Sequence, residues 1–293
     1  MIHLRTHFLL IALLYTSVSH AQEPVVNLLW PNGAPGALGD EAKDKPTLTL
    51  YPATGKNRTE AAVVILPGGG YGGLAIGHEG HEIAKWFNKM GVSAFICEYR
   101  HRGRGYGHPA PLQDAQRAIR TVRAGAKELK INPAKIGIIG FSAGGHLCST
   151  TGTHFDAGNP KDKDPIQQVS CRPDFMILCY PVIAFDEAYT HKGSQRNLLG
   201  TDAKPALIKS LSNEKQVTSE TPPTFLFHTY EDKVVPVKNS LVFYSALVDA
   251  GIPSEMHIYQ KGRHGVGLGA SIPGTNAWPK QCEAWMKGLG VLD

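Results

Sequence analysis

The chain has 293 residues, of which 42% are hydrophobic and 19% are charged, and its formal net charge is +5. This is an ordinary length for one α/β domain with a single large core. The charge is modest and spread along the sequence, so we expect no polyanionic partner such as nucleic acid.

The N-terminus has the three regions of a signal peptide. Arg5 precedes an apolar run over residues 8–15, and Ser19-His20-Ala21 then form the small-residue region. A membrane anchor is the alternative, but this run is much shorter than the roughly 20 residues that a bilayer span needs. We therefore expect a signal peptide over residues 1–21, cleavage after Ala21, secretion or periplasmic residence, and no membrane span.

Short apolar runs then alternate with helical patterns, which predicts a mostly parallel sheet flanked by helices on both faces. The expected strands are residues 62–66, 92–97, 136–139, 175–180, 224–228 and 255–259. Helical patterns cover residues 83–90, 112–129, 241–248 and 278–289. Residues 181–223 have no strand pattern, and we expect them to form a small cap over the site, because long insertions in compact folds are often functional.

The loop after the first of these strands, residues 67–71, reads Pro-Gly-Gly-Gly-Tyr. With Gly73 it satisfies the Gly-x-Gly-x-x-Gly pattern of dinucleotide-binding proteins, and Glu98 ends the next strand where a ribose-binding acid would lie. Against this, the helical pattern begins only near Glu79, too far on to direct a helix N-terminus at a pyrophosphate. We therefore assign this loop to an oxyanion hole, in which the backbone amides of Gly69 and Gly70 approach a developing oxyanion.

Residues 78–82, His-Glu-Gly-His-Glu, approximate a zinc motif. That motif needs histidines four residues apart on one helical face, whereas His78 and His81 are three apart around a glycine. We therefore expect no metal and no cofactor. A helix-start role is expected for Glu79, and a place at the edge of a pocket for either histidine.

The helix that begins at Leu112 carries a basic stripe. Its members are Arg117, Arg120, Arg123 and Lys127, opposite an apolar face that includes Ala115, Ile119 and Val122. Because the stripe has helical spacing, we interpret it as the solvated face of an amphipathic helix.

The pentapeptide Gly-x-Ser-x-Gly at residues 140–144 follows the third of these strands and precedes a helical stretch of small residues. This context is typical of a nucleophile elbow, in which both glycines are needed because the serine lies on a sharp strand-to-helix turn. Ser142 is then the nucleophile, and the backbone amide of Ala143 is an oxyanion donor. Cys148, on the helix behind it, is interpreted as a packing residue.

An acid and a histidine follow the serine in the order that such an elbow requires. Asp232 lies on the loop after the strand at 224–228, with Glu231 as its neighbouring competitor. His264 lies between glycines on the loop after the strand at 255–259. We assign His264 as the general base and Asp232 as the acid that orients it.

Five cysteines are an odd number for an exported protein, so at least one thiol must stay free or pair between chains. Cys97 and Cys179 lie in strand-like apolar runs. They are expected to be small buried hydrophobes rather than parts of a disulfide framework.

Together these motifs resemble α/β-hydrolases of the secreted carbohydrate esterase group, the acetylxylan and feruloyl esterase-like (BD-FAE-like) family. The resemblance covers nearly the whole mature chain. It is carried by residues 30–36, 67–71, 108–115, 140–146, 180–182, 213–217, 221–225 and 264–265. Related lipase-like esterases have histidine where this chain has Pro67, ahead of the three glycines.

The resemblance implies one α/β-hydrolase catalytic domain over residues 22–293, acting on acetyl or feruloyl esters of a polysaccharide such as acetylated xylan. An acylated oligo- or polysaccharide is then the expected partner, while the acyl group and the oligomeric state stay open. Tyr71, His81 and Tyr180 are candidates for the pocket walls. The alternatives are an exopeptidase of the prolyl-oligopeptidase type, without the usual propeller, and a non-catalytic binder with this fold.

Overall fold

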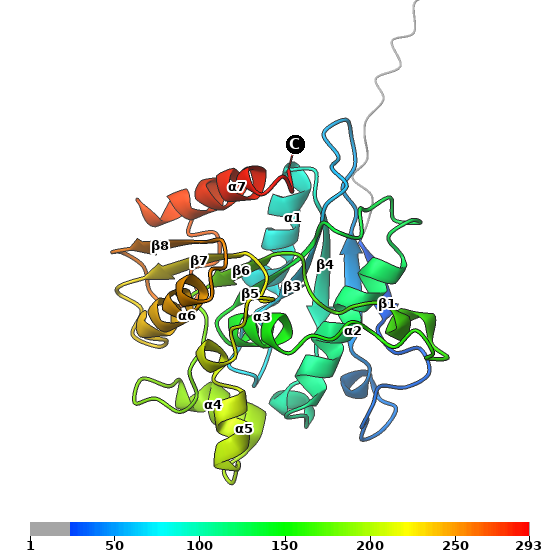
Figure 1. Ribbon diagram of the computed structural model, residues 1–293, viewed down its shortest axis with the longest axis horizontal. Helices are drawn as coiled ribbons and strands as arrows, with labels where there is room; N and C mark the ends of the chain where they lie inside the picture. The colour runs from blue at the N-terminus through cyan, green and yellow to red at the C-terminus, as the bar shows by residue number, and fades with distance from the viewer. Residues whose placement is uncertain (1–23, 293) are drawn as a thin grey trace, which may run out of the picture.

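Eight strands form one sheet through the middle of the part of the chain that the computed structural model describes, residues 24–292 (Figure 1). Their order across the sheet is β1-β2-β4-β3-β5-β6-β7-β8. The strands are β1 Val25–Leu28, β2 Thr47–Tyr51, β3 Ala62–Leu66, β4 Ser93–Glu98, β5 Ile136–Phe141, β6 Met176–Cys179, β7 Thr224–Thr229 and β8 Ser254–Tyr259. The β1–β2 and β2–β4 pairs are antiparallel, and the other pairs are parallel.

Helices cover both faces of this sheet. They are α1 Glu82–Lys89, α2 Ala110–Ala124, α3 Ala143–Thr153, α4 Lys192–Leu199, α5 Pro205–Ser210, α6 Lys238–Asp249 and α7 Trp278–Gly288. Buried side chains of α2, α3 and α6 share one core cluster with the sheet, and those of α1 and α7 share the other. The predicted sheet with helices on both faces is confirmed.

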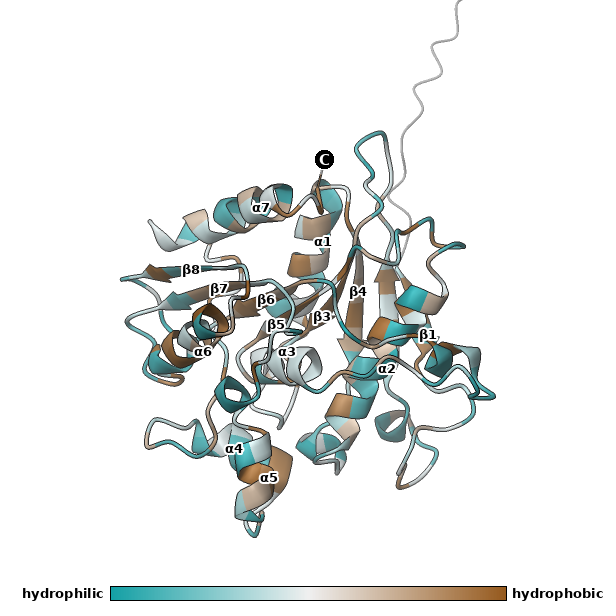
Figure 2. Cartoon of the chain, viewed as in Figure 1, coloured by the Kyte–Doolittle hydropathy of each residue, from teal (hydrophilic) through white to brown (hydrophobic). Residues whose placement is uncertain are grey.

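The central strands are apolar because both of their faces are covered. Every residue of β3, β5, β6 and β7 is buried, so these strands show a continuous apolar run instead of alternation. Figure 2 shows them as the most hydrophobic part of the molecule, with polar residues on the outer sides of the helices. This burial is what made them recognisable in the sequence.

The β1–β2 pair was not expected from the sequence. All four residues of β1 are exposed, and this strand pairs only with β2, at the edge of the sheet. A short exposed edge strand has neither an apolar run nor a buried face, so no periodic pattern reveals it.

The basic stripe on α2 is not solvated, contrary to the expectation. The guanidinium groups of Arg117, Arg120 and Arg123 form ion pairs with Asp164, Asp156 and Asp174. Arg117 and Arg120 are only 3% and 7% exposed. The loop between α3 and β6 covers this side of α2, and its aspartates compensate the buried positive charge.

The segment 181–223 contains α4 and α5 and no strand, as expected. It reaches the loop after β3, where the side-chain amide of Asn197 donates to the carbonyl oxygen of Gly70 at 2.8 Å. Within residues 24–292, no helix has the length and hydropathy of a membrane span. The expected signal peptide lies outside the described residues.

Candidate active site

Ser142 lies on a strained turn between β5 and α3. Its backbone has φ 53° and ψ −118°, a combination that few residues other than glycine adopt. The glycines on either side allow the close crossing of chains: a Cβ atom at Gly140 would lie 2.1 Å from the Gly144 oxygen, and one at Gly144 would lie 2.1 Å from the Leu66 oxygen. No side chain fits at either position, so the turn requires both glycines.

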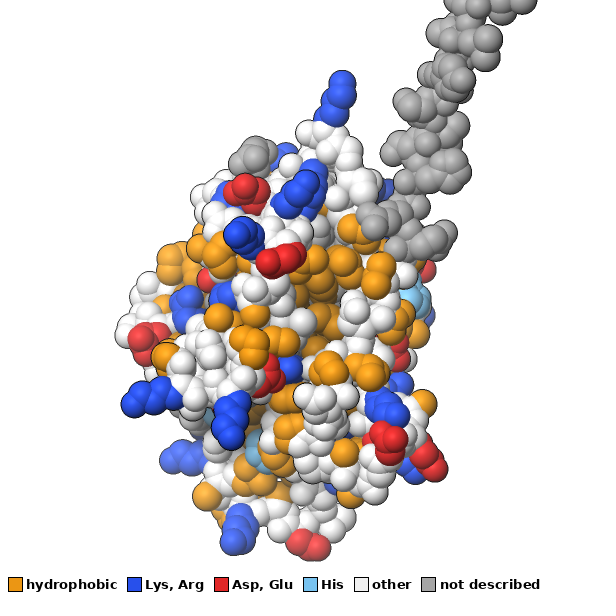
Figure 3. All heavy atoms as spheres, turned by 90° about the vertical axis from the view of Figure 1, so that its right-hand side faces the viewer, with side chains coloured by type: hydrophobic (Ala, Val, Ile, Leu, Met, Phe, Trp, Pro, Cys, Tyr) orange, Lys and Arg blue, Asp and Glu red, His pale blue; other side chains and the backbone are white. Residues whose placement is uncertain are grey.

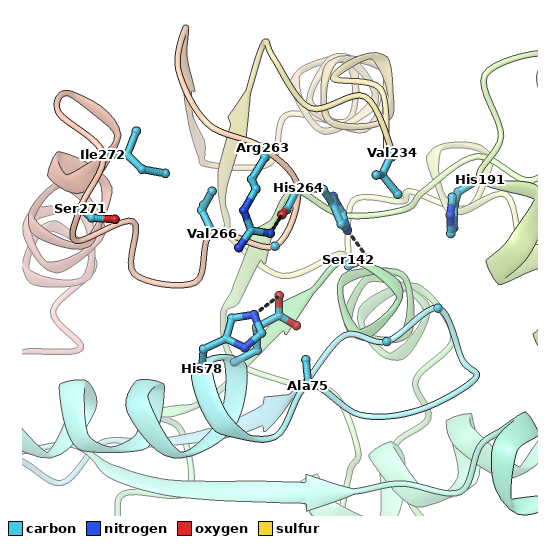
Figure 4. Close-up of a pocket in the computed structure, with 14 residues that line it drawn as sticks. Ala75, His78, Ser142, His191, Val234, Arg263, His264, Val266, Ser271 and Ile272 are labelled. Atoms are coloured by element: carbon cyan, nitrogen blue, oxygen red, sulfur yellow. Dashed lines mark hydrogen bonds and ion pairs between the residues drawn. The ribbon is translucent and has the colours of Figure 1, made fainter.

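The hydroxyl of Ser142 is hydrogen-bonded to a histidine (Figure 4), and the histidine is hydrogen-bonded to an aspartate. Ser142 Oγ is 2.8 Å from His264 Nε2, and His264 Nδ1 is 2.6 Å from Asp232 Oδ2. The three residues follow β5, β8 and β7, which are parallel, so they meet at the carboxyl edge of the sheet. The structure thus brings together the three residues that the motif order selected.

Asp232 is held as a carboxylate by its surroundings. Its side chain is fully buried, and Oδ1 accepts hydrogen bonds of 2.9 Å from the amides of Val234 and Val235. Burial opposes ionisation, but contacts with His228 and His264 outweigh it and hold the pKa of Asp232 well below its ordinary value. The competitor Glu231 instead accepts from Lys261 Nζ at 2.7 Å, on the exposed side of the loop.

Three backbone amides are available beside Ser142. Among the described residues, no acceptor is bonded to the amides of Gly69, Gly70 or Ala143. Gly69 and Gly70 line the cavity at Ser142, while Ala143 begins α3 directly after it. Gly69 has φ 133°, and a Cβ atom there would lie 2.2 Å from the Gly73 oxygen, so this loop conformation requires glycine. The arrangement can stabilise an oxyanion.

A cavity of about 760 Å³ opens over these groups. Figure 4 shows Arg263 and Val266 beside His264 on one side, His191 from the segment 181–223 on another, and His78 opposite. Burial lowers the pKa of His191, so its imidazole is less easily protonated than usual. Neither Arg263 nor His191 was singled out from the sequence, because no local pattern marks a residue as a cavity wall.

Tyr71, His81 and Tyr180 are not among the residues that line this cavity. Tyr71 and Tyr180 are each 1% exposed, and their hydroxyls bond to His146 and Glu79 beneath the site. His81 Nδ1 lies 2.6 Å from the Tyr51 hydroxyl, away from the cavity lining. Of the two histidines in the 78–82 motif, His78 is the one that reaches the cavity.

The glycine loop does not have the geometry of a dinucleotide site. The amide of Gly68 donates to Glu79 Oε2 at 2.8 Å, and α1 begins only at Glu82. A helix N-terminus therefore does not follow Gly73 directly, as pyrophosphate binding would require.

One acidic cluster lies apart from the active site. Ligand atoms of Asp186, Glu187 and Glu214 lie within 4.8 Å of one another, and the ammonium group of Lys215 is ion-paired to all three. The positive charge of Lys215 already balances part of the cluster's charge.

The five cysteines are unpaired and buried. Cys148 lies on α3 with its sulfur 3.6 Å from the Ile138 oxygen, and burial raises the pKa of its thiol well above the ordinary value. It therefore packs against the sheet and does not face the cavity, as the sequence indicated.

Comparisons with known proteins give a consistent set of relatives. The family model described as BD-FAE matches residues 48–247. An acetylxylan esterase of Xylanibacter ruminicola is 37% identical over 240 residues, which are 80% of this chain and 47% of that protein. Endo-1,4-beta-xylanase B of Butyrivibrio fibrisolvens is 40% identical over 207 residues, 70% of this chain and 32% of that protein. The chain thus spans half or less of the length of these curated relatives.

Solved structures cover the chain more completely. An acetyl ester-xyloside bifunctional hydrolase from Caldicellulosiruptor lactoaceticus superposes with a TM-score of 0.86 and 44% identity, over 92% of this chain and 97% of that one. An alpha/beta hydrolase enzyme from a Medee basin deep-sea metagenome library superposes with a TM-score of 0.63 and 30% identity, over 87% and 95%.

Proposed function

The chain belongs to the BD-FAE family and has the α/β-hydrolase fold, and on this premise we propose that it is a serine carboxylic-ester hydrolase. Its substrates in this proposal are acetyl or feruloyl esters of a polysaccharide such as acetylated xylan. The observation that carries the reaction type is the hydrogen-bonded chain from Ser142 through His264 to Asp232, next to three free amide donors.

The first half of the reaction acylates the serine. His264 Nε2, 2.8 Å from Ser142 Oγ, takes the hydroxyl proton as the oxygen attacks the acyl carbon. The amides of Gly69, Gly70 and Ala143 stabilise the oxyanion, each such donor contributing roughly 3 kcal/mol. His264 then gives the proton to the leaving sugar oxygen, and the acyl group remains on Ser142.

The second half hydrolyses the acyl-enzyme. A water molecule gives its proton to His264 and attacks the acyl carbon, and the histidine returns the proton to Ser142 Oγ as the acid leaves. Asp232 accepts a hydrogen bond from His264 Nδ1, so it fixes the tautomer and stabilises the imidazolium that forms twice per turnover.

The polysaccharide assignment draws on the relatives and on the cavity. One relative is named an acetylxylan esterase, and another is named an acetyl ester-xyloside bifunctional hydrolase. The cavity is open, and among its lining residues are the polar side chains of His78, His191 and Arg263, which can hydrogen-bond to a sugar.

Two other functions make different predictions. A prolyl-oligopeptidase-type exopeptidase would use the same triad on an amide bond. The amine that leaves from an amide is a poorer leaving group than the sugar hydroxyl that leaves from an ester. A non-catalytic binder would not need a serine, histidine and aspartate in hydrogen-bond contact. The relative named acetylxylan esterase favours the ester.

The test is release of acetate and ferulate from acetylated and feruloylated xylo-oligosaccharides, with p-nitrophenyl acetate and a proline-anilide peptide assayed in parallel. We expect acetate or ferulate release that disappears in Ser142→Ala and persists in Cys148→Ala, the control for the nearby thiol. Turnover of p-nitrophenyl acetate alone would sink the polysaccharide assignment, and cleavage of the anilide alone would make the protein a peptidase.

We also propose that the protein is exported and that residues 22–293 are the mature catalytic domain. The charged, apolar and small-residue regions of residues 1–21 support this. N-terminal sequencing of protein recovered outside the cytoplasm should begin at Gln22; an intact Met1 on exported protein would contradict cleavage after Ala21.

A further inference from the structure

Glu79 is a buried carboxylate at the floor of the active-site cavity. It is 2% exposed and lies in a turn of π-helix, Gly77–His81, that leads into α1. Its described contacts include none of the three triad residues. A buried charged group needs compensating hydrogen bonds, so the partners of Glu79 indicate what it does.

One oxygen of Glu79 holds the oxyanion loop. Oε2 accepts the amide hydrogen of Gly68 at 2.8 Å. Gly68 is so tightly enclosed that a Cβ atom there would lie 2.7 Å from Glu79 Oε2 and 2.9 Å from Ser142 Cβ. The carboxylate therefore fixes the loop where it passes the nucleophile, directly ahead of the donor amides of Gly69 and Gly70.

The other oxygen of Glu79 holds the histidine loop through a tyrosine. Oε1 accepts the hydroxyl hydrogen of Tyr180 at 2.8 Å, and the Tyr180 oxygen accepts the amide hydrogen of Gly267 at 3.0 Å. The Tyr180 ring also meets the His264 ring edge to face, with centroids 5.2 Å apart. His78 Nε2 approaches the same oxygen, at 3.6 Å, from the cavity side.

We propose that Glu79 is a positioning residue, which fixes the oxyanion donors relative to the general base by joining their two loops. The inference rests on the ester-hydrolase function proposed above. Both oxygens of the carboxylate accept hydrogen bonds, whereas an amide has one acceptor. An amide would therefore either set an N–H group against that of Gly68 or reverse the bond to Tyr180, whose hydroxyl hydrogen would lose this acceptor. The π-helical turn, a feature frequent at functional sites, directs this side chain under the loops.

The first test is Glu79→Gln, assayed with p-nitrophenyl acetate. We expect kcat to fall about 10- to 100-fold with KM within about twofold, because misplaced donors and base act on the transition state. The matched control is Glu82→Gln, the same change at an exposed position of α1, with both constants within about twofold of wild type.

A second readout follows the nucleophile itself. Labelling with diethyl p-nitrophenyl phosphate forms the Ser142 Oγ–P bond and breaks the bond from phosphorus to p-nitrophenolate, while His264 takes the serine proton. The labelling rate of Glu79→Gln should fall in parallel with kcat, counted per folded molecule. A rise in KM alone, or a labelling rate within twofold of wild type, would overturn the proposal.

Tyr180→Phe keeps the proposal testable where Glu79→Gln folds poorly, since it leaves the Glu79–Gly68 bond in place. We expect a reduced kcat, and the double variant should lose little more than the worse single variant, because both changes break one bridge. Additive losses would overturn it.

The labelling assay also separates this proposal from the substrate assignment. Wild-type protein that is labelled but releases nothing from xylo-oligosaccharides would sink the polysaccharide substrate alone, and the labelling-rate ratio would still decide on Glu79. Wild-type protein inert to both reagents would sink the two proposals together.

Discussion

Ser142, His264 and Asp232 differ in what their loss should cost. In the proposed mechanism the serine forms the covalent bond and the histidine moves every proton, whereas the aspartate only orients and stabilises the imidazolium. Removing the first two should therefore be at least as damaging as removing the third.

We predict that Ser142→Ala and His264→Ala each lower kcat by about six orders of magnitude, and Asp232→Asn by about four. The measurement is kcat on p-nitrophenyl acetate after removal of any wild-type contaminant. Asp232→Asn with near-wild-type activity would contradict the assigned acid, and Glu231→Gln, which changes the exposed neighbour, is the control.

The glycines of the elbow should be as sensitive as the triad, but through the fold. At Gly144 a methyl group would lie 2.1 Å from the Leu66 oxygen, a backbone atom that cannot move aside. We predict that Gly144→Ala lowers the free energy of unfolding by several kcal/mol and abolishes activity.

The control for Gly144 is Gly288→Ala at the end of α7, where nothing lies within 4 Å of an added Cβ atom. This change should leave stability the same or raise it by about 0.5 to 1 kcal/mol. Urea denaturation compares the two, and equal stabilities for both variants would contradict the close packing at the elbow.

His146, four residues after the nucleophile, should make stability depend on pH. Burial lowers its pKa from 6.5 to about 3, and both ring nitrogens are engaged, by the Tyr71 hydroxyl and the Leu211 oxygen. Between these pKa values the unfolded chain binds the proton and the folded chain does not, so the free energy of unfolding decreases as the pH falls through this range.

At pH 5 we predict a loss of about 2 kcal/mol from His146, relative to pH 7. Between pH 7 and pH 5, the free energy of unfolding of His146→Gln should therefore decrease by about 2 kcal/mol less than that of wild type. Urea denaturation at both pH values measures this difference. Identical pH dependence in the two proteins would show that His146 does not contribute.

At the scale of elements, a buried ion pair links helix and sheet in the N-terminal half. Arg100, just after β4, and Asp114, on α2, are both fully buried, and two guanidinium nitrogens lie 2.9 Å from the two carboxylate oxygens. Trp30 Nε1 and the Arg100 amide also donate to this carboxylate, at 2.9 Å each. Four donors thus converge on Asp114.

We predict that Asp114→Ala lowers the free energy of unfolding by about 3 to 5 kcal/mol, because it leaves Arg100 buried without its counter-charge. Glu283→Ala, which removes the exposed partner of Lys287, should change it by less than about 1 kcal/mol. Urea midpoints measure both, and similar small losses would mean that water reaches Arg100.

The elements also mark the limits of prediction from sequence. The central strands were recognisable because two covered faces demand an unbroken apolar run, whereas β1 has no buried face. The arginines of α2 have the spacing of a solvated face, and nothing local reveals that their aspartates lie 36 to 51 residues away. Burial of charge is decided by such distant partners.

The residues of the active site also fall into some that the sequence could predict and others that it could not. Ser142, His264 and Asp232 could be assigned because each stands in a local context that the turn geometry imposes, in a fixed order along the chain. The cavity walls could not, apart from His78 as one of two candidate histidines, since His191, Arg263 and His78 come from three separate segments. Tyr71 and Tyr180 follow strands into the protein, and a tyrosine has the same appearance in a sequence whether its ring faces a cavity or the core.

At the scale of the whole molecule, positive charge is dispersed over the face that Figure 3 shows. Figure 3 shows lysine and arginine side chains separated by polar, apolar and acidic ones on the face that carries β1. Several of the arginines that count toward the net charge of +5 form ion pairs inside the protein, namely those of α2 and Arg100.

The cysteines have one more consequence, for experiments on the molecule itself. All five thiols are buried and unpaired, so a maleimide reagent finds no native target on the folded protein. A cysteine introduced at an exposed position such as Asp202, between α4 and α5, would therefore take up a fluorophore or spin label selectively. The native protein therefore needs no removal of its own cysteines before a label is placed on the segment 181–223 over its active site.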